Sequence, residues 1–207
     1  MICLEGPSAV GKTTLARHLE ERFGFPRVAE VNELFAGATR DGPTWYFDRQ
    51  VERHGFAAAA IQRARSTVLD GDPFQPLWYN WIYPEFGPVT DAVHYYSKAI
   101  IGGHIAFPDC YVVLAAPREA LRARKDGDRT RRRGNFERHL KMIEAQRRYF
   151  TALRDHAGVA VHFIDNIQTA ATAARIADLP RAAGPKSTAA LQIIADWLAA
   201  QPAAEFA

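Results

Sequence analysis

One nine-residue run constrains this chain more than any other feature. Residues 6–14 read Gly-Pro-Ser-Ala-Val-Gly-Lys-Thr-Thr, which matches the pattern G-x-x-x-x-G-K-[ST] in full. An apolar stretch at 2–4 precedes the run, and apolar residues at helical spacing follow it over 13–23. A strand, a glycine-rich turn and a helix in this order let backbone amides surround phosphate groups. We therefore predict a phosphate-binding loop.

Each residue type in this loop has its own chemical role in binding a nucleotide. Glycine permits turns that a Cβ would obstruct, so the loop amides can point inward to phosphate oxygens. Lys12 places a positive charge against the outer phosphates, which gives it a catalytic role, and the Thr13 hydroxyl can bind magnesium. The expected cofactors are ATP and Mg²⁺. The predicted nucleotide-binding residues are Gly6, Ser8, Ala9, Val10, Gly11, Lys12, Thr13 and Thr14.

Short apolar runs alternate with longer helical segments along the chain. Further strands are expected at 27–31, 67–69, 110–116 and 159–164. Helices are expected at 44–65, 90–101, 135–154, 170–177 and, near the C-terminus, about 188–200. This alternation predicts parallel strands joined by right-handed crossovers. The expected fold is a three-layer α/β nucleotide-binding fold with about five parallel strands and helices on both faces, in a single domain over 1–207.

Composition excludes several classes of protein. The hydrophobic fraction of 48% and charged fraction of 24% are ordinary for a folded domain. A net charge of +3 does not by itself call for nucleic acid or a membrane. Cys3 and Cys110 lie in apolar runs and are expected to be core thiols in a reducing compartment. No secretory signal or 18-residue apolar span is apparent, so we expect a cytoplasmic location and no membrane partner.

Acidic residues follow several predicted strands. Ligands of open α/β sheets bind beyond the carboxyl ends of the strands, where Glu30, Asp70, Asp72 and Asp165 fall. Phosphoryl transfer needs a carboxylate near the metal and a group that positions the acceptor. Asp70 is predicted to bind magnesium, Glu30 to accept the acceptor's proton, and Asp72 to share either role. Which of these three is the base stays open, and the alternative is that they cap turns or helices.

An arginine-rich segment, about 122–134, is predicted to form a lid. Glycines at 127 and 134 bracket its central part, and planar guanidinium groups match phosphate oxygens. Arginines closing over the phosphates would stabilise the charge of the transition state. The alternatives are a solvated basic face and a nucleic-acid patch. The predicted catalytic arginines, among which the one that contacts phosphate stays open, are Arg129, Arg131, Arg132 and Arg133.

Aromatic residues gather in two segments near the acidic strand ends. Trp45 begins the predicted helix at 44–65, and Trp78 and Tyr79 follow the third strand. Aromatic rings could enclose a planar or apolar acceptor while Gln50 supplies hydrogen bonds. These four residues, with Glu30, form the predicted acceptor site. The alternative for each ring is ordinary core packing.

On these residues the sequence resembles the P-loop kinase superfamily, and within it the deoxynucleoside kinase and thymidylate kinase group. The resemblance spans roughly residues 1–165. It implies that Glu30 is the base for the acceptor hydroxyl, that Asp70 lies near magnesium, and that Gln50 is the glutamine that pairs with the base. The third strand departs from the group's pattern of an acid followed by arginine, because here Asp70 is followed by Gly71. Bacterial P-loop kinases that inactivate antibiotics share the same core.

The resulting hypothesis is an ATP-dependent phosphotransferase that acts on a hydroxyl of a nucleoside-like or antibiotic-like small molecule. A nucleotide monophosphate kinase is one alternative, which Arg49 and Arg53 near the acceptor region keep open. A regulatory ATPase and a kinase acting on nucleic-acid ends are the others. The expected partner is a small-molecule acceptor; a nucleic-acid partner is not expected, and a homodimer is left open.

Overall fold

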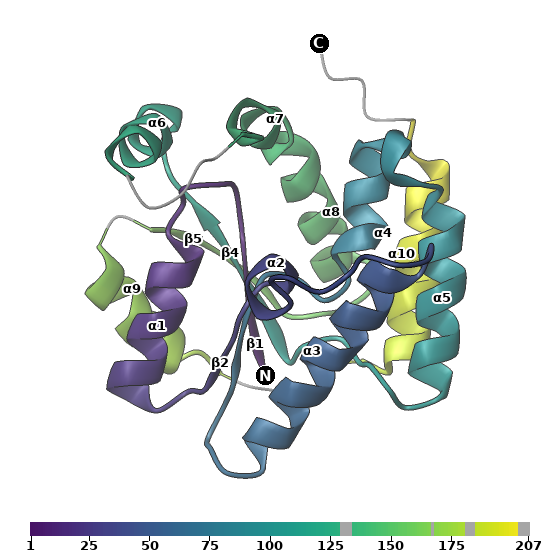
Figure 1. The fold of residues 1–207 in the computed structure, drawn as a ribbon, viewed down its shortest axis with the longest axis horizontal. Helices are drawn as coiled ribbons and strands as arrows, with labels where there is room; N and C mark the ends of the chain where they lie inside the picture. Colours follow the sequence, from purple (N-terminus) through teal and green to yellow (C-terminus); the bar gives the residue numbers. More distant parts are fainter. Residues whose placement is uncertain (129–133, 167, 181–184, 203–207) are drawn as a thin grey trace.

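The computed structural model describes residues 1–128, 134–166, 168–180 and 185–202. Its strands form one sheet in the order β2-β3-β1-β4-β5, in which every neighbouring pair is parallel (Figure 1). This confirms the predicted α/β fold with about five parallel strands. The strands are β1 Ile2–Glu5, β2 Arg27–Val28, β3 Val68–Asp70, β4 Cys110–Ala115 and β5 Val161–Asp165.

Alternate residues of the central strands enter two separate cores. Ile2 and Leu4 of β1 pack on one side of the sheet, whereas Cys3 packs on the other. Strands that are buried on both faces read as nearly continuous apolar runs, which is how β1 and β4 appear in the sequence. Cys3 and Cys110 are both fully buried, as predicted for core thiols.

Helices cover both faces of the sheet (Figure 1). One face carries α1 Lys12–Phe23 and α9 Thr169–Ala177, which pack against each other. The other face carries α3 Trp45–Ile61, α4 Gln75–Ile82, α5 Val89–Ile101, α8 Ile143–Asp155 and α10 Ser187–Ala200. The shorter elements are α2 Val31–Leu34, η1 Pro84–Phe86, α6 Arg118–Gly127 and α7 Phe136–Lys141. None of the described helices is long and apolar enough to span a membrane.

The helix expected over 135–154 is two helices, α7 and α8, which meet at Met142. The ψ angle of Met142 is −9°, well away from the value near −42° of a regular helix. Phe136 and Leu140 before the break belong to the core under α1 and α9, whereas Met142 and Ala145 belong to the opposite core. The break therefore lets one segment contribute to both cores.

The second strand is shorter than the predicted 27–31. Pairing with β3 ends at Val28, because the carbonyl of Ala29 accepts a hydrogen bond from the Arg53 side chain. The carbonyl of Glu30 then accepts the amides of Glu33 and Leu34, which starts α2. Glu30 consequently lies at the N-terminus of a short helix beyond the strand end.

Candidate nucleotide and acceptor site

The loop between β1 and α1 has a backbone that requires glycine at two positions. Gly6 has φ of 137°, and a Cβ there would lie 2.5 Å from the carbonyl oxygen of Leu114 in β4. Gly11 has φ of 99°, and its Cβ would lie 2.8 Å from Nδ2 of Asn166. Both values of φ belong to the region that L side chains rarely adopt. At Gly6 and Gly11 a larger side chain would therefore be sterically unfavourable.

A pocket of about 680 Å³ opens along this loop. It brings Lys12 and Thr13 together with Glu30, which comes from the β2–α2 junction. The predicted base and the predicted phosphate-binding residues therefore share one cavity. The lining residues are Pro7, Ser8, Ala9, Val10, Gly11, Lys12, Thr13, Thr14, Arg17, Glu30, Arg124, Asp128 and His139.

Lys12 folds back onto its own loop. Its Nζ donates to the carbonyl of Gly6 at 2.7 Å and lies 3.9 Å from Oε1 of Glu5. Glu5 is buried and accepts the amide of Gly6 at 2.8 Å and that of Asp72 at 3.0 Å. Burial raises the pKa of Glu5, although Lys12 and these two amides act in the opposite direction. Glu5 therefore connects the phosphate loop to the turn after β3.

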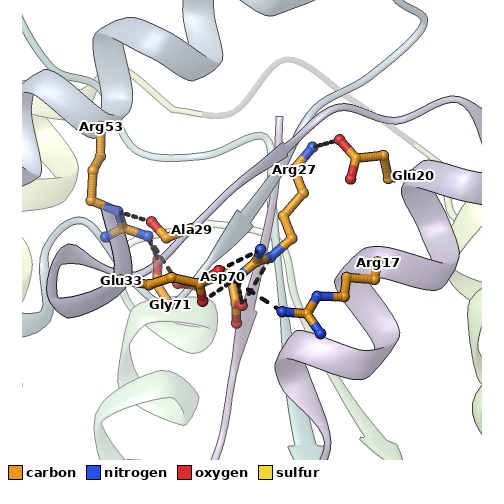
Figure 2. Close-up of polar contacts among 8 residues, drawn as sticks. All are labelled: Arg17, Glu20, Arg27, Ala29, Glu33, Arg53, Asp70 and Gly71. Atoms are coloured by element: carbon orange, nitrogen blue, oxygen red, sulfur yellow. Dashed lines mark hydrogen bonds and ion pairs between the residues drawn. The ribbon is translucent and has the colours of Figure 1, made fainter. Parts of the chain in front are cut away.

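Asp70, the predicted magnesium ligand, lies buried beside Arg27 (Figure 2). Arg27 donates from Nε and Nη2 to Oδ2 of Asp70 at 3.2 and 3.0 Å. The same guanidinium also donates to both carboxylate oxygens of Glu33, at 3.0 and 2.6 Å. Burial acts to lower the pKa of Arg27, but Glu33 and Asp70 raise it overall. One oxygen of Asp70 is thus engaged by a cation.

The other oxygen, Oδ1 of Asp70, is buried and has no hydrogen-bond partner in the described part of the chain. A buried acceptor of this kind suits a hard cation, and Mg²⁺ typically takes one or two carboxylates together with substrate phosphates. Within the described residues, no cluster of three or more His, Cys, Asp or Glu could hold a metal by itself. Asp70 is, however, not among the described residues that line the pocket with Thr13, so a magnesium site formed by these two residues stays a prediction.

Asp72 is fully engaged by the protein. Its carboxylate accepts the amide of Phe74 and the hydroxyl of Tyr111, both at 2.9 Å, and the indole N–H of Trp78 at 3.0 Å. Burial and the nearby Glu5 raise the pKa of Asp72 to about 7. These contacts give Asp72 a part in packing, and they place the predicted acceptor residue Trp78 in the core, with no exposed surface.

The remaining predicted acceptor residues lie in different surroundings. Gln50 is buried and accepts a hydrogen bond from Arg53. Trp45 lies under the guanidinium groups of Arg40 and Arg49, with 5.5 and 5.8 Å to its ring centre. Tyr79 packs against the rings of Trp78, Tyr83 and Phe86.

The arginine-rich segment begins as a helix. Arg122 and Arg124 lie in α6, and Arg122 pairs with Glu137 of α7. Arg124 lines the pocket and donates to the carbonyls of Val10 and Asn166, at 3.1 and 2.7 Å. The predicted catalytic residues Arg129, Arg131, Arg132 and Arg133 lie outside the described residues.

Several residues of the site did not stand out in the sequence. Arg17 and His139 line the pocket without belonging to any motif. Asn166 donates from Nδ2 to the carbonyl of Val10 at 2.7 Å, across 156 residues of chain. Only its position directly after a predicted strand could have indicated it. Arg27 and Arg53 gave no signal beyond their charge.

The sheet order, the glycine-constrained loop and the lysine and threonine that follow it define a P-loop nucleotide-binding protein. A profile of the family described as AAA domain matches residues 1–162. The chain belongs to this AAA domain family.

Two of the solved structures with a similar fold are of one enzyme. They are deoxyadenosine kinase from M. mycoides with the products dCMP and a flexible dCDP bound, and the same enzyme with bound dATP. Sequence identity is 16% and 13%, and the TM-scores are 0.53 and 0.55. In both cases 84% of this chain is covered, and 95% and 96% of the solved chain. No curated protein sequence matched the chain. The fold is thus the one predicted from the resemblance to P-loop kinases.

Proposed function

We propose that this protein is an ATP-dependent kinase that transfers the γ-phosphoryl group to a hydroxyl of a nucleoside-like small molecule. One observation carries the proposal. Glu30 lines the same pocket as Lys12 and Thr13, and its carboxylate makes no hydrogen bond or ion pair to other described residues. A carboxylate that has no partner among the described residues and lies beside a phosphate loop can act on an acceptor.

The chemistry follows from the residues of the pocket. The loop amides and Lys12 bind the ATP phosphates, while Thr13 and Asp70 would hold magnesium. Magnesium, when bound, neutralises charge on the outer phosphates. Glu30 accepts the proton of the acceptor hydroxyl as that oxygen bonds to the γ-phosphorus and the bond to the ADP oxygen breaks. The products are the phosphorylated acceptor and ADP.

Three arginines, Arg27, Arg49 and Arg53, favour a hydroxyl acceptor over a phosphate acceptor because each is engaged within the protein. Arg53 donates four hydrogen bonds within the protein. Arg27 is held by Asp70 and Glu33, and Arg49 by Glu52. An acceptor that already carries phosphate would need free cations at this place, so these contacts support a neutral acceptor.

The structures of similar fold support a nucleoside-like acceptor. Deoxyadenosine kinase from M. mycoides was solved with dCMP, dCDP and dATP. By this likeness the acceptor of the present chain would carry a sugar hydroxyl. Antibiotic-like hydroxyl compounds stay as an alternative, and the segment at about 122–134 stays the proposed lid.

The experiment is phosphoryl transfer from γ-labelled ATP with magnesium to a panel of deoxynucleosides, deoxynucleoside monophosphates and hydroxylated antibiotics. The proposal expects a labelled monoester from a nucleoside and none from the monophosphates. A product only from the monophosphates would replace the hydroxyl kinase by a nucleotide kinase. ATP binding without transfer to any acceptor would contradict the kinase proposal and favour a regulatory ATPase.

A further inference from the structure

Arg53 is a buried cation in the middle of α3, with 1% of its surface exposed. Its Nε donates to the carbonyl of Ala29 at 2.7 Å, and its Nη2 donates to the carbonyls of Asp70 and Gly71 at 2.9 and 3.1 Å. Its Nη1 donates to Oε1 of Gln50. One guanidinium thus joins the chain beyond β2 to the chain at the end of β3, as Figure 2 shows.

No carboxylate forms an ion pair with Arg53 within the part of the chain that the structure describes. Removing a cation from water costs several kcal/mol, and here main-chain carbonyls with one amide oxygen replace the water. An apolar side chain would fill the same volume without that cost. It would also leave the carbonyls of Ala29, Asp70 and Gly71 without these donors.

These carbonyls belong to the segments that carry the acidic residues of the site. Ala29 directly precedes Glu30, and Asp70 is itself the end of β3. Gly71, which follows Asp70, has φ of 97° and lies against the side chain of Glu30. The position that a Cβ would take there is 3.5 Å from Cγ and 4.0 Å from Oε1 of Glu30. The same position is 4.0 Å from Nη2 of Arg53. The guanidinium and the Glu30 side chain therefore lie against the same peptide unit.

We propose that Arg53 is a positioning residue, whose planar set of donors fixes Glu30 relative to the end of β3 and to the phosphate loop. The inference rests on the proposed function, because it takes Glu30 to be the group that acts on the acceptor. Arg53 is not assigned a contact to the acceptor, since four of its five donors are already engaged within the protein. The sequence had left Arg53 as a candidate for such a contact, and the structure gives it a different role.

Geometry, and not charge alone, is what Arg53 supplies. Lysine keeps the positive charge, but a single ammonium group cannot reach the Ala29 carbonyl and the two carbonyls at 70 and 71 with the geometry of a planar fork. Misplacement of a catalytic group by about 1 Å can cost about 100-fold in rate. The Arg53→Lys variant therefore separates positioning from electrostatics.

The test compares Arg53→Lys and Arg53→Met with Arg63→Met, an exposed arginine just beyond the same helix. Each variant is measured for amide hydrogen exchange, ATP affinity, and kcat and KM for acceptor phosphorylation. For Arg53→Lys we expect exchange at least about 10-fold faster at 29–31 and 70–72 but unchanged at 6–14. We also expect kcat to fall at least about 10-fold, with ATP affinity within about two-fold. Arg63→Met should match the wild type.

Wild-type kcat and wild-type exchange in Arg53→Lys would overturn the inference. So would a lower melting temperature with kcat unchanged, which is what a merely stabilising residue gives. If Arg53→Met does not fold, the lysine variant decides alone. If the wild type phosphorylates no acceptor, the proposed function fails, and the exchange data still decide whether Arg53 holds the two strand ends.

Discussion

The phosphate loop and the ends of β2 and β3 are built in different ways. The loop is one contiguous run between β1 and α1, and its constraints are local turns and positive φ angles at Gly6 and Gly11. The strand ends are held by contacts between distant residues, such as Arg27 with Asp70, which are 43 positions apart. The phosphate loop is thus specified by a motif, and the strand ends by tertiary packing.

This difference explains how each of the two regions tolerates change. A motif of backbone turns fails when a single residue no longer fits its φ angle or its space. A network of buried polar groups fails when one partner is removed and the other is left buried and unpaired. Loss of the Lys12 charge should therefore affect chemistry with little effect on stability, whereas loss of a buried partner or of a motif glycine should lower stability.

The largest effect is expected for Lys12→Ala. Removal of a charge that stabilises the transition state should lower kcat by about 100-fold or more, with little change in the melting temperature because Lys12 makes its hydrogen bond to a loop carbonyl. Phosphoryl transfer and thermal unfolding would be measured together. Lys98→Ala, at an exposed position of α5, is the control. Equal activity of the two variants would contradict a catalytic role for Lys12.

Arg27→Met should give the largest loss of stability. It leaves the fully buried Asp70 without its cation, which should lower the free energy of unfolding by about 3 kcal/mol. Arg17→Met is the matched control, because Arg17 lies 3.9 Å from the same Glu33 but both side chains are exposed. Arg17→Met should lower the free energy of unfolding by less than about 1 kcal/mol. Similar losses for the two variants in urea unfolding would show that the strand ends do not depend on the buried pair of Arg27 and Asp70.

Gly6→Ala should lower stability by about 2 kcal/mol. The new methyl group meets the backbone carbonyl of Leu114 at 2.5 Å, and φ of 137° is unfavourable for alanine. Gly24→Ala provides the comparison, because Gly24 also has positive φ but nothing lies within 4 Å of its Cβ position. It should cost about 1 kcal/mol. Equal costs would mean that space along the loop is not limiting.

The smallest effect is a pH dependence from Asp72. Burial raises its pKa to about 7 in the folded protein, above the ordinary value of 3.8, so between these two pH values the folded state holds a proton that the unfolded state has lost. Stability should therefore fall as pH rises toward 7 and level off above it. Between pH 6 and 8 the loss should be about 1 kcal/mol. This loss is measured as the difference in the pH dependence of unfolding free energy between the wild type and Asp72→Asn. The same pH dependence in both proteins would contradict the prediction.

The sequence was sufficient for the parts of the molecule that are local. Short patterns predict the strand–loop–helix unit and the burial of the two cysteines. The alternation of strands with helices predicts the parallel sheet. The junction at Met142 did not, because it depends on which core Phe136 and Ala145 enter. The end of β2 did not either, since it is set by Arg53 from another helix.

The acceptor site shows the same limit. The sequence placed Glu30, Asp70 and Asp72 together because they follow predicted strands, and it could not distinguish their surroundings. In the structure Glu30 lines the pocket, and Asp70 forms an ion pair with Arg27. Asp72 accepts hydrogen bonds from Phe74, Trp78 and Tyr111. Arg27 and Tyr111 lie 43 and 39 positions away from their acidic partners, and the sequence has no periodic pattern that would indicate these pairs.

The central claim is that Glu30 acts on the acceptor hydroxyl beside the phosphate loop. The most direct measurement is kcat for phosphoryl transfer in Glu30→Gln, together with its dissociation constant for ATP. The account expects kcat to fall by about 100-fold or more, with ATP affinity unchanged within about two-fold. Transfer at the wild-type rate in this variant would contradict the assignment of Glu30 as the base.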